Sequence, residues 1–254
     1  MYFICTSLNS KETSGNYRPV SLTSVPCKVM ESLLKDELTK YVETTSMLSK
    51  VQHGFCQGRS CLTNFLETFE AWTLALDQGY GIDVVYLDYR KAFDTVWHSG
   101  LLTKIQGYGV EGQLLAWIKS FLQGRRSDWV DVSSGVPRGS VLGPLLFLIF
   151  VNDISEWIKS NVKMFADNSK VWTRISTLRD GEVLQDDLNN LMSWSDKWKL
   201  EFNPEKCKVM HIGHSKNKVQ HECTRESLGV RRNQRRKRSG NNSYQQLETK
   251  STVC

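Results

Sequence analysis

The sequence predicts an α+β fold, because strand-like segments that carry an aspartate alternate with segments of helical spacing. The first strand-like segment, 82–88, is nearly all apolar and ends at Asp88, so we expect a central strand covered on both faces. The second, 162–172, reads VKMFADNSKVW and is typical of a β-hairpin that presents Asp167 and Asn168 at its turn. Two carboxylates held in this way can bind a metal ion together.

Helical spacing predicts helices at about 27–42, 62–76, 93–107, 113–122, 141–159 and 183–199. We expect the large apolar side chains of the second helix to face the core; they are Leu62, Phe65, Leu66, Phe69 and Trp72. Trp194 and Trp198 lie one turn apart in the last helix. Packing in the core is the favoured interpretation of this pair, and stacking on bases is the alternative. A further strand is expected at 209–212.

The composition is that of an ordinary globular protein, with 40% hydrophobic and 24% charged residues in a chain of 254. The formal net charge of +6 is concentrated in 231–238, which read RRNQRRKR, and the rest of the chain is balanced. Any attraction of the folded body for nucleic acid must therefore come from a local patch. The candidate nucleic-acid-binding residues of this segment are Arg231, Arg232, Arg235, Arg236, Lys237 and Arg238.

The seven cysteines include no Cys-x-x-Cys pair, which favours reduced thiols in an intracellular protein, nuclear or cytoplasmic. The longest apolar run, 141–151, is too short for a membrane span, and the run at 2–5 is too short for a signal peptide. We therefore expect a soluble protein without a membrane partner. A zinc site is a weaker alternative, because its ligand spacing matches no closed site well; the ligands would be Cys207, His211, His214 and Cys223.

Long motifs in a fixed order cover about residues 16–214. They read NYRPVSLTSVPCKVMESLL, QHGFCQGRSCLTN, VVYLDYRKAFDTVWH, SGVPRGSVLGPLLFLIFVNDI, MFADNSKVW and LQDDLNNLMSWSDKWKLEFNPEKCKVMHIG. These motifs resemble the reverse transcriptases of non-LTR (LINE-type) retrotransposons, and most closely the chicken-repeat and jockey-like branch. The resemblance implies a right-hand polymerase with fingers in 1–80, a palm in 81–182 and the end of the palm and a partial thumb in 183–214. A disordered basic tail is expected in 215–254.

The activity that the resemblance implies is RNA-directed DNA polymerisation. Deoxynucleoside triphosphates would extend a DNA primer along an RNA template, with Mg²⁺ as the cofactor and Mn²⁺ as an alternative. Nucleotidyl transfer of this kind uses two metal ions about 3.5–4 Å apart, held by oxygen ligands. The implied ligands are the carboxylates of Asp88 and Asp167, together with the backbone carbonyl of Tyr89.

The resemblance also implies the groups that contact the nucleotide, which are Phe93, Lys28, Arg59, Pro137, Arg138 and Gly139. Phe93 would be the steric gate against a ribose 2′-hydroxyl, with simple packing as the alternative. The loop 135–140 consists largely of small residues, so its backbone can approach the nucleotide base and the template closely. Lys28 and Arg59 are the candidates for contacts with the triphosphate.

Three departures from the family pattern predict a truncated, degenerate copy whose activity is weakened or lost. The family's hairpin turn usually carries a second aspartate where this chain has Asn168, and the family usually has glutamine in place of Arg138. A palm strand is missing after Arg126, and the loss of a strand exposes a sheet edge. The alternative to a weakened polymerase is a non-catalytic remnant that at most binds nucleic acid.

Overall fold

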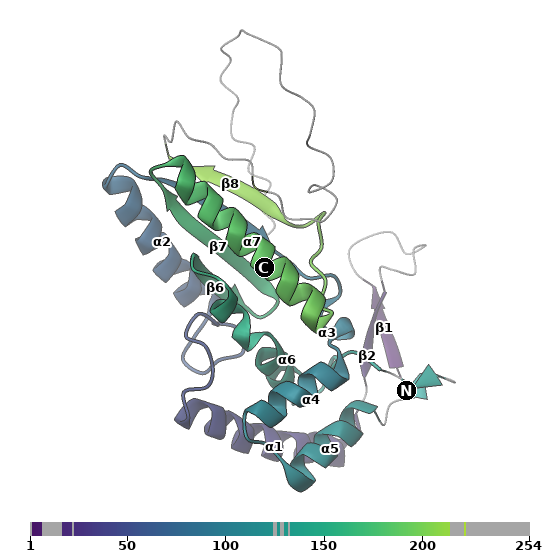
Figure 1. The fold of residues 1–254 in the computed structure, drawn as a ribbon. Helices are drawn as coiled ribbons and strands as arrows, with labels where there is room; N and C mark the ends of the chain where they lie inside the picture. Colours follow the sequence, from purple (N-terminus) through teal and green to yellow (C-terminus); the bar gives the residue numbers. More distant parts are fainter. Residues whose placement is uncertain are drawn as a thin grey trace. The chain divides into compact units, whose positions relative to one another are not determined.

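Figure 1 shows the computed structural model, which describes residues 2–6, 17–21, 23–123, 126–127, 130–131, 133–213 and 221. Apart from His221, the expected tail at 215–254, with its basic segment 231–238, lies outside these residues. No helix in the part of the chain that is described has the length and apolar character needed to cross a membrane.

The central element is a four-stranded antiparallel sheet in the order β6-β7-β3-β8. Its strands are β3 (Gly81–Leu87), β6 (Asn161–Phe165), β7 (Asn168–Ile175) and β8 (Lys208–Ile212). The strand predicted to be central is confirmed as β3, which lies between β7 and β8 and is buried at every position except Tyr86. The predicted hairpin is also confirmed, because β6 and β7 pair through a two-residue connection.

Helices cover both faces of the sheet. On one face, Val85 and Leu87 of β3 belong to the main core together with Leu188 and Trp194 of α7 (Leu178–Trp198). Figure 1 shows α7 lying over β7 and running along it. On the other face, Val84 packs with Ala75 of α2 (Cys61–Asp77). Successive side chains of β3 point to opposite faces of the sheet, so this one strand packs against both α7 and α2.

The apolar face expected for α2 is wrong, because the helix turns a polar face inward. Leu62, Phe65, Leu66 and Phe69 are each more than half exposed, and Trp72 is partly buried against Trp172. The buried residues of α2 are instead Asn64, Thr68 and Ala75. Asn64 Nδ2 donates to the Met164 carbonyl of β6 at 3.0 Å, so the buried face of α2 carries a hydrogen bond to the sheet.

The other described elements are β1 (Tyr2–Thr6), β2 (Tyr17–Ser21), α1 (Val25–Thr44), α3 (Ala92–Thr95), α4 (His98–Gly107), α5 (Gly112–Gln123), β4 (Arg126–Ser127), β5 (Val130–Asp131), α6 (Gly143–Val151) and the 3₁₀ helix η2 (Asn152–Trp157). The single helix expected at 93–107 is divided into α3 and α4. The helix expected at 141–159 becomes 3₁₀ at Asn152, whose side chain accepts from Ser49 N and donates to Met47 O. Around Arg126, where a family strand is expected to be missing, the described backbone forms the short pair β4–β5.

A buried ion pair joins α4 to η2 and α7. Lys104 Nζ donates to Asp153 Oδ1 and to the Phe150 carbonyl, both at 2.5 Å, and lies 3.9 Å from the centre of the Trp198 ring. Burial lowers the pKa of Lys104 to about 8, although the Asp153 carboxylate opposes this shift. Trp194 donates its indole N–H to the same carboxylate at 2.9 Å. Trp194 is therefore a core residue, as favoured from the sequence.

We expect Asp153→Ala to lower the free energy of unfolding by about 3 kcal/mol, because it leaves a buried ammonium without its partner. Urea unfolding at pH 7, followed by tryptophan fluorescence, measures this loss. Asp186→Ala is the control, since Asp186 is an exposed aspartate on α7. Equal unfolding midpoints for the two variants would show that the ion pair contributes nothing to stability.

Candidate active site

The structure brings Asp88 and Asp167 to the same end of the two central strands, β3 and β7. β3 ends at Leu87, opposite Ser169 of β7, so Asp88 leaves its strand where the antiparallel partner begins. Burial raises the pKa of Asp167, and the nearby charge of Asp88 raises it further. The charges of Lys206 and Arg138 act on the same carboxyl and lower its pKa. Two carboxylates and two cations therefore share one site.

The turn that carries Asp167 differs in detail from the expected one. Phe165 pairs with Asn168, so the turn itself consists of Ala166 and Asp167. Asn168 is the first residue of β7 and is exposed, whereas it was expected in the turn. Of the turn residues, Ala166 has the positive φ, 54°. This conformation is unusual for alanine, and hydrogen bonds with the side chain of Gln52, outside the hairpin, stabilise it.

Lys206, which was not among the residues expected at the site, donates from its Nζ to Asp88 Oδ2 at 3.0 Å. The chain before it runs beside Asp88: Asn203 N donates to the Asp88 carbonyl at 2.8 Å, and Arg90 N donates to Glu201 O at 2.8 Å. Neither of these two backbone bonds uses the carbonyl of Tyr89, which was expected to be a metal ligand. Lys206 lies within a motif that carries the resemblance, and this is the signal that could have found it.

The loop that carries Arg138 packs against the residues that follow β3. Gly135 N donates to Val96 O and Val136 N donates to Phe93 O, both at 2.7 Å. Arg138 Nε donates to Asp94 Oδ1 at 2.9 Å, and its guanidinium carbon lies 6.0 Å from the centre of the Phe93 ring. Asp94, which was not among the residues expected at the site, therefore determines where the cation of Arg138 lies.

The flanking positions Pro137 and Gly139 differ in exposure. Pro137 is buried, and its carbonyl accepts from Ser140 Oγ at 2.8 Å. Gly139 is exposed with a φ of 84°, a conformation that favours glycine. The backbone of Gly139 is therefore the part of this loop that a ligand can approach most closely.

Phe93 lies beside this loop and is packed on one face. Its ring stacks on Phe147 of α6, with centroids 4.5 Å apart, and the exposed Phe55 ring is nearly perpendicular to it, with centroids 6.5 Å apart. Because the stack on Phe147 restrains the ring, its orientation does not depend on a ligand. This geometry is compatible with both the gate and the packing interpretation.

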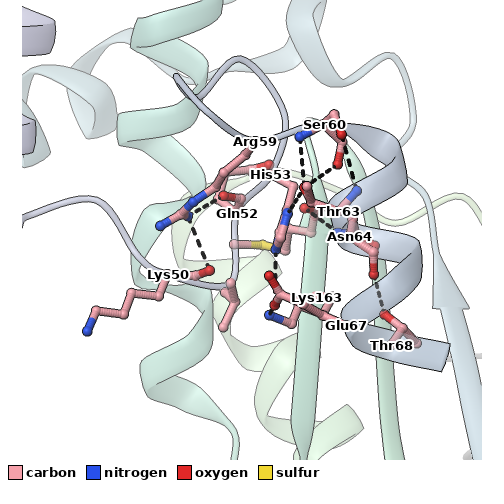
Figure 2. A network of polar contacts seen from close by, with 12 residues as sticks. Lys50, Gln52, His53, Arg59, Ser60, Thr63, Asn64, Glu67, Thr68 and Lys163 are labelled. Atoms are coloured by element: carbon pink, nitrogen blue, oxygen red, sulfur yellow. Dashed lines mark hydrogen bonds and ion pairs between the residues drawn. The ribbon is translucent and has the colours of Figure 1, made fainter. Parts of the chain in front are cut away.

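The two candidate triphosphate contacts differ in their surroundings. Lys28 is exposed on α1, one turn before Glu31, whose buried carboxylate accepts from Val141 N and Leu142 N. Arg59 Nη1 donates to the carbonyls of Ser49, Lys50 and Gln52 (Figure 2). The guanidinium of Arg59 thus links the two ends of the loop 49–60. The sequence did not indicate this structural role.

The oxygen atoms available at this site suit a hard divalent cation, which prefers oxygen ligands. Asp88 and Asp167 supply carboxylates, and the ammonium of Lys206 already occupies a cation position beside Asp88. Within the described residues, no three His, Cys, Asp or Glu side chains converge to hold a metal. A metal here would therefore depend on these two carboxylates and on backbone, substrate or water oxygens. Of the residues considered for zinc, His211 is engaged with Asp83, while His214 and Cys223 lie outside the described residues.

We expect Lys206→Ala to tighten Mn²⁺ binding about three- to fivefold, because an exposed ion pair of this kind contributes up to about 1 kcal/mol that the metal must overcome. Isothermal titration of Mn²⁺ into the protein measures the change. Lys208→Ala removes an exposed lysine two residues away and should leave the affinity as it is. Weaker binding by Lys206→Ala would mean that the ammonium supports the metal site instead of competing with it.

We also expect Asp167→Asn to stabilise the metal-free protein at pH 7. Because the pKa of Asp167 is raised in the folded state, ionising this carboxyl costs stability, and the cost grows as the pH rises through the folded pKa. The gain in melting temperature over the unsubstituted protein should shrink toward zero as the pH falls to the ordinary value of 3.8. Thermal unfolding in EDTA over this pH range tests the prediction, and a gain that does not vary with pH contradicts it.

Comparison with known proteins gives the family. The family model described as "Reverse transcriptase (RNA-dependent DNA polymerase)" matches residues 9–243. The probable RNA-directed DNA polymerase from transposon X-element of Drosophila melanogaster is 32% identical over 207 residues, which are 76% of this chain and 23% of that protein. The RNA-directed DNA polymerase from mobile element jockey of the same species is 32% identical over 217 residues, with the same coverage of 76% and 23%.

The chain thus spans about a quarter of the length of these relatives. Among solved structures, telomerase from Candida albicans superposes with a TM-score of 0.55 at 11% identity, over 81% of this chain and 40% of that one. Apo telomerase from Candida tropicalis gives 0.55 at 9% identity, over 82% and 46%. At these identities the likeness shows the fold, a mixed α+β architecture. From the family model and the relatives, the chain belongs to the reverse transcriptase family and is related to the enzymes of the jockey and X-element retrotransposons.

Proposed function

We propose that this chain is the polymerase domain of a non-LTR retrotransposon and that it extends a DNA primer along an RNA template. The observation that carries the proposal is the convergence of Asp88 and Asp167 at one end of the central strands β3 and β7. Membership of the reverse transcriptase family supports the reaction class. RNA template, DNA primer and deoxynucleoside triphosphates are the partners that follow from it, in a nuclear or cytoplasmic location.

The proposed domain organisation is a right hand. The palm comprises 81–182, the fingers 1–80, and the end of the palm with the start of the thumb 183–214. Two contacts support this division and refine it: β8 pairs with β3, which extends the palm sheet to Ile212, and the loop 49–60 is hydrogen-bonded to β6. The tail 215–254 is proposed as a basic nucleic-acid-binding segment through 231–238.

In this proposal Asp88 and Asp167 hold Mg²⁺, with Mn²⁺ as an alternative and the Tyr89 carbonyl as a further ligand. The bound metal would activate the primer 3′-hydroxyl and neutralise charge on the triphosphate. Asp88 is held in place by the backbone bond from Asn203, and Asp167 must be ionised to bind a cation. Because burial and Asp88 raise the pKa of Asp167, metal binding should strengthen as the pH rises.

Around the carboxylates, the proposed substrate contacts are made by groups that are already oriented. Phe93, fixed on Phe147, would limit space beside the sugar, and Arg138 would offer its guanidinium to phosphate only after leaving Asp94. Lys28 and Arg59 would approach the triphosphate from the fingers, while Pro137 and Gly139 would present backbone to the base.

A non-catalytic remnant that at most binds nucleic acid is the second candidate function. Two observations favour it. The site contains Asn168 where a carboxylate is expected, and one negative charge about 4 Å from a metal ion is worth roughly 4 kcal/mol at an effective dielectric constant of 20. In addition, Arg138 forms an ion pair with Asp94, so a long charged side chain occupies the loop over the nucleotide position.

Primer extension on an RNA template distinguishes the two candidates. We expect weak extension that favours Mn²⁺ over Mg²⁺, because Mn²⁺ binds oxygen sites more tightly and dehydrates more readily. Asn168→Asp should raise Mg²⁺-dependent extension at least about tenfold by restoring a charge near the metal. Adding Arg138→Gln should raise it further.

Asp88→Ala is the reference for background extension. Suppose that the Asn168→Asp and Arg138→Gln variant extends no better than Asp88→Ala with either metal. The polymerase proposal then fails for this chain, and the remnant is the better description. Filter binding of the primer–template at low and high salt would show whether nucleic-acid binding remains.

A further inference from the structure

The turn that carries Asp167 is held by a side chain from a distant segment. Gln52 is 1% exposed, and its Oε1 accepts a hydrogen bond from Ala166 N at 2.9 Å, while its Nε2 donates to Ala166 O at 3.3 Å. The side-chain amide thus bonds both backbone groups of one residue, as a neighbouring strand would. The same Oε1 also accepts from Gly54 N at 2.7 Å.

Ala166 requires such support because of its backbone conformation. Its φ of 54° lies in the left-handed region, which costs a residue with a Cβ roughly 1–2 kcal/mol. Neither turn residue is a glycine, so the hairpin does not adopt this conformation without cost. Because Ala166 directly precedes Asp167, the backbone angles of Ala166 determine the direction in which the carboxylate points.

Gln52 is itself fixed by a polar network between the loop 49–60 and β6 (Figure 2). His53 N donates to Met164 O at 2.9 Å, and Met164 N donates to Val51 O at 2.8 Å, so the loop forms a parallel bridge with the strand. Arg59 Nη1 donates to the Gln52 carbonyl at 2.6 Å. The loop also approaches the turn closely, since a Cβ at Gly54 would lie 2.3 Å from Ala166 N.

We infer that Gln52 is a positioning residue for Asp167: it selects the left-handed conformation of Ala166 and thereby orients the carboxylate for a divalent cation. The inference rests on the proposed function for its role in metal binding, but the conformation of the turn can be measured independently of any metal. Gln52 itself is not expected to contact metal or substrate.

The test compares three substitutions in the full chain. Gln52→Met keeps a similar volume but makes neither bond to Ala166, whereas Gln52→Glu keeps acceptor oxygens for Ala166 N and Gly54 N. Asn64→Leu is the matched control, because it removes a buried hydrogen bond to Met164 O in the same network without touching the turn. Amide hydrogen exchange by NMR reports on Ala166, and Mn²⁺ electron paramagnetic resonance reports on metal affinity.

We expect Gln52→Met to accelerate exchange of the Ala166 amide about tenfold and to weaken Mn²⁺ binding by a similar factor. The reason is that losing one hydrogen bond of this kind shifts the equilibrium for local opening of the turn several-fold. Gln52→Glu should retain most of the protection and the affinity. Asn64→Leu should lower the melting temperature without a comparable change at Ala166 or in Mn²⁺ binding.

Two results overturn the inference: unchanged Ala166 exchange in Gln52→Met, or equal changes in Gln52→Met and Asn64→Leu. Failure of the proposed function gives a different result. If Asp167→Ala binds Mn²⁺ as tightly as the unsubstituted protein, the assigned metal site is wrong, and Ala166 exchange alone then decides whether Gln52 holds the turn.

Discussion

The antiparallel pairing of β3 with β7 is the constraint on which the rest of the structure depends. It places the end of one strand beside the beginning of the other, so two aspartates that are far apart in the sequence meet at one end of this strand pair. The same pairing arranges the core, because β3 has α2 against one face and α7 against the other. Loss of this register by one residue would exchange the two faces and separate the carboxylates.

At this end of β3 and β7, the negative charges of the aspartates are balanced by cationic side chains of the chain itself. Lys206 contacts Asp88, and Arg138 contacts Asp94, while both cations act on Asp167. In the absence of metal, these contacts reduce the repulsion between the two carboxylates. Under the proposed function, a bound cation would take over that role.

The loop 49–60 connects the candidate fingers to the candidate metal site. Its hydrogen bonds to Met164 and Ala166 cover the free edge of β6, which would otherwise present unpaired backbone groups. Covering this edge requires polar partners, and Asn64 of α2 is one of them. The large apolar side chains of α2 lie on its exposed face.

The sequence by itself determined those elements whose pattern of apolar residues is consistent with only one kind of secondary structure. The apolar run of β3, the hairpin β6–β7, the helix α5 and the apolar stretch of α6 lie where expected. Asp88 and Asp167 were proposed as metal ligands from the sequence, because an aspartate at the end of a buried strand and one at a hairpin turn are local features. Trp194 was likewise placed correctly in the core.

Tertiary structure alone decided which polar groups are partners. The bonds from Lys206 to Asp88, from Arg138 to Asp94 and from Gln52 to Ala166 join segments that no local pattern relates. The orientation of α2 was misjudged for the same reason, because apolar periodicity does not reveal the hydrogen bond from Asn64 to the Met164 carbonyl. Periodicity reports the tendency of a segment to bury apolar surface, whereas the identity of a hydrogen-bond partner depends on backbone groups brought close only by the folded chain.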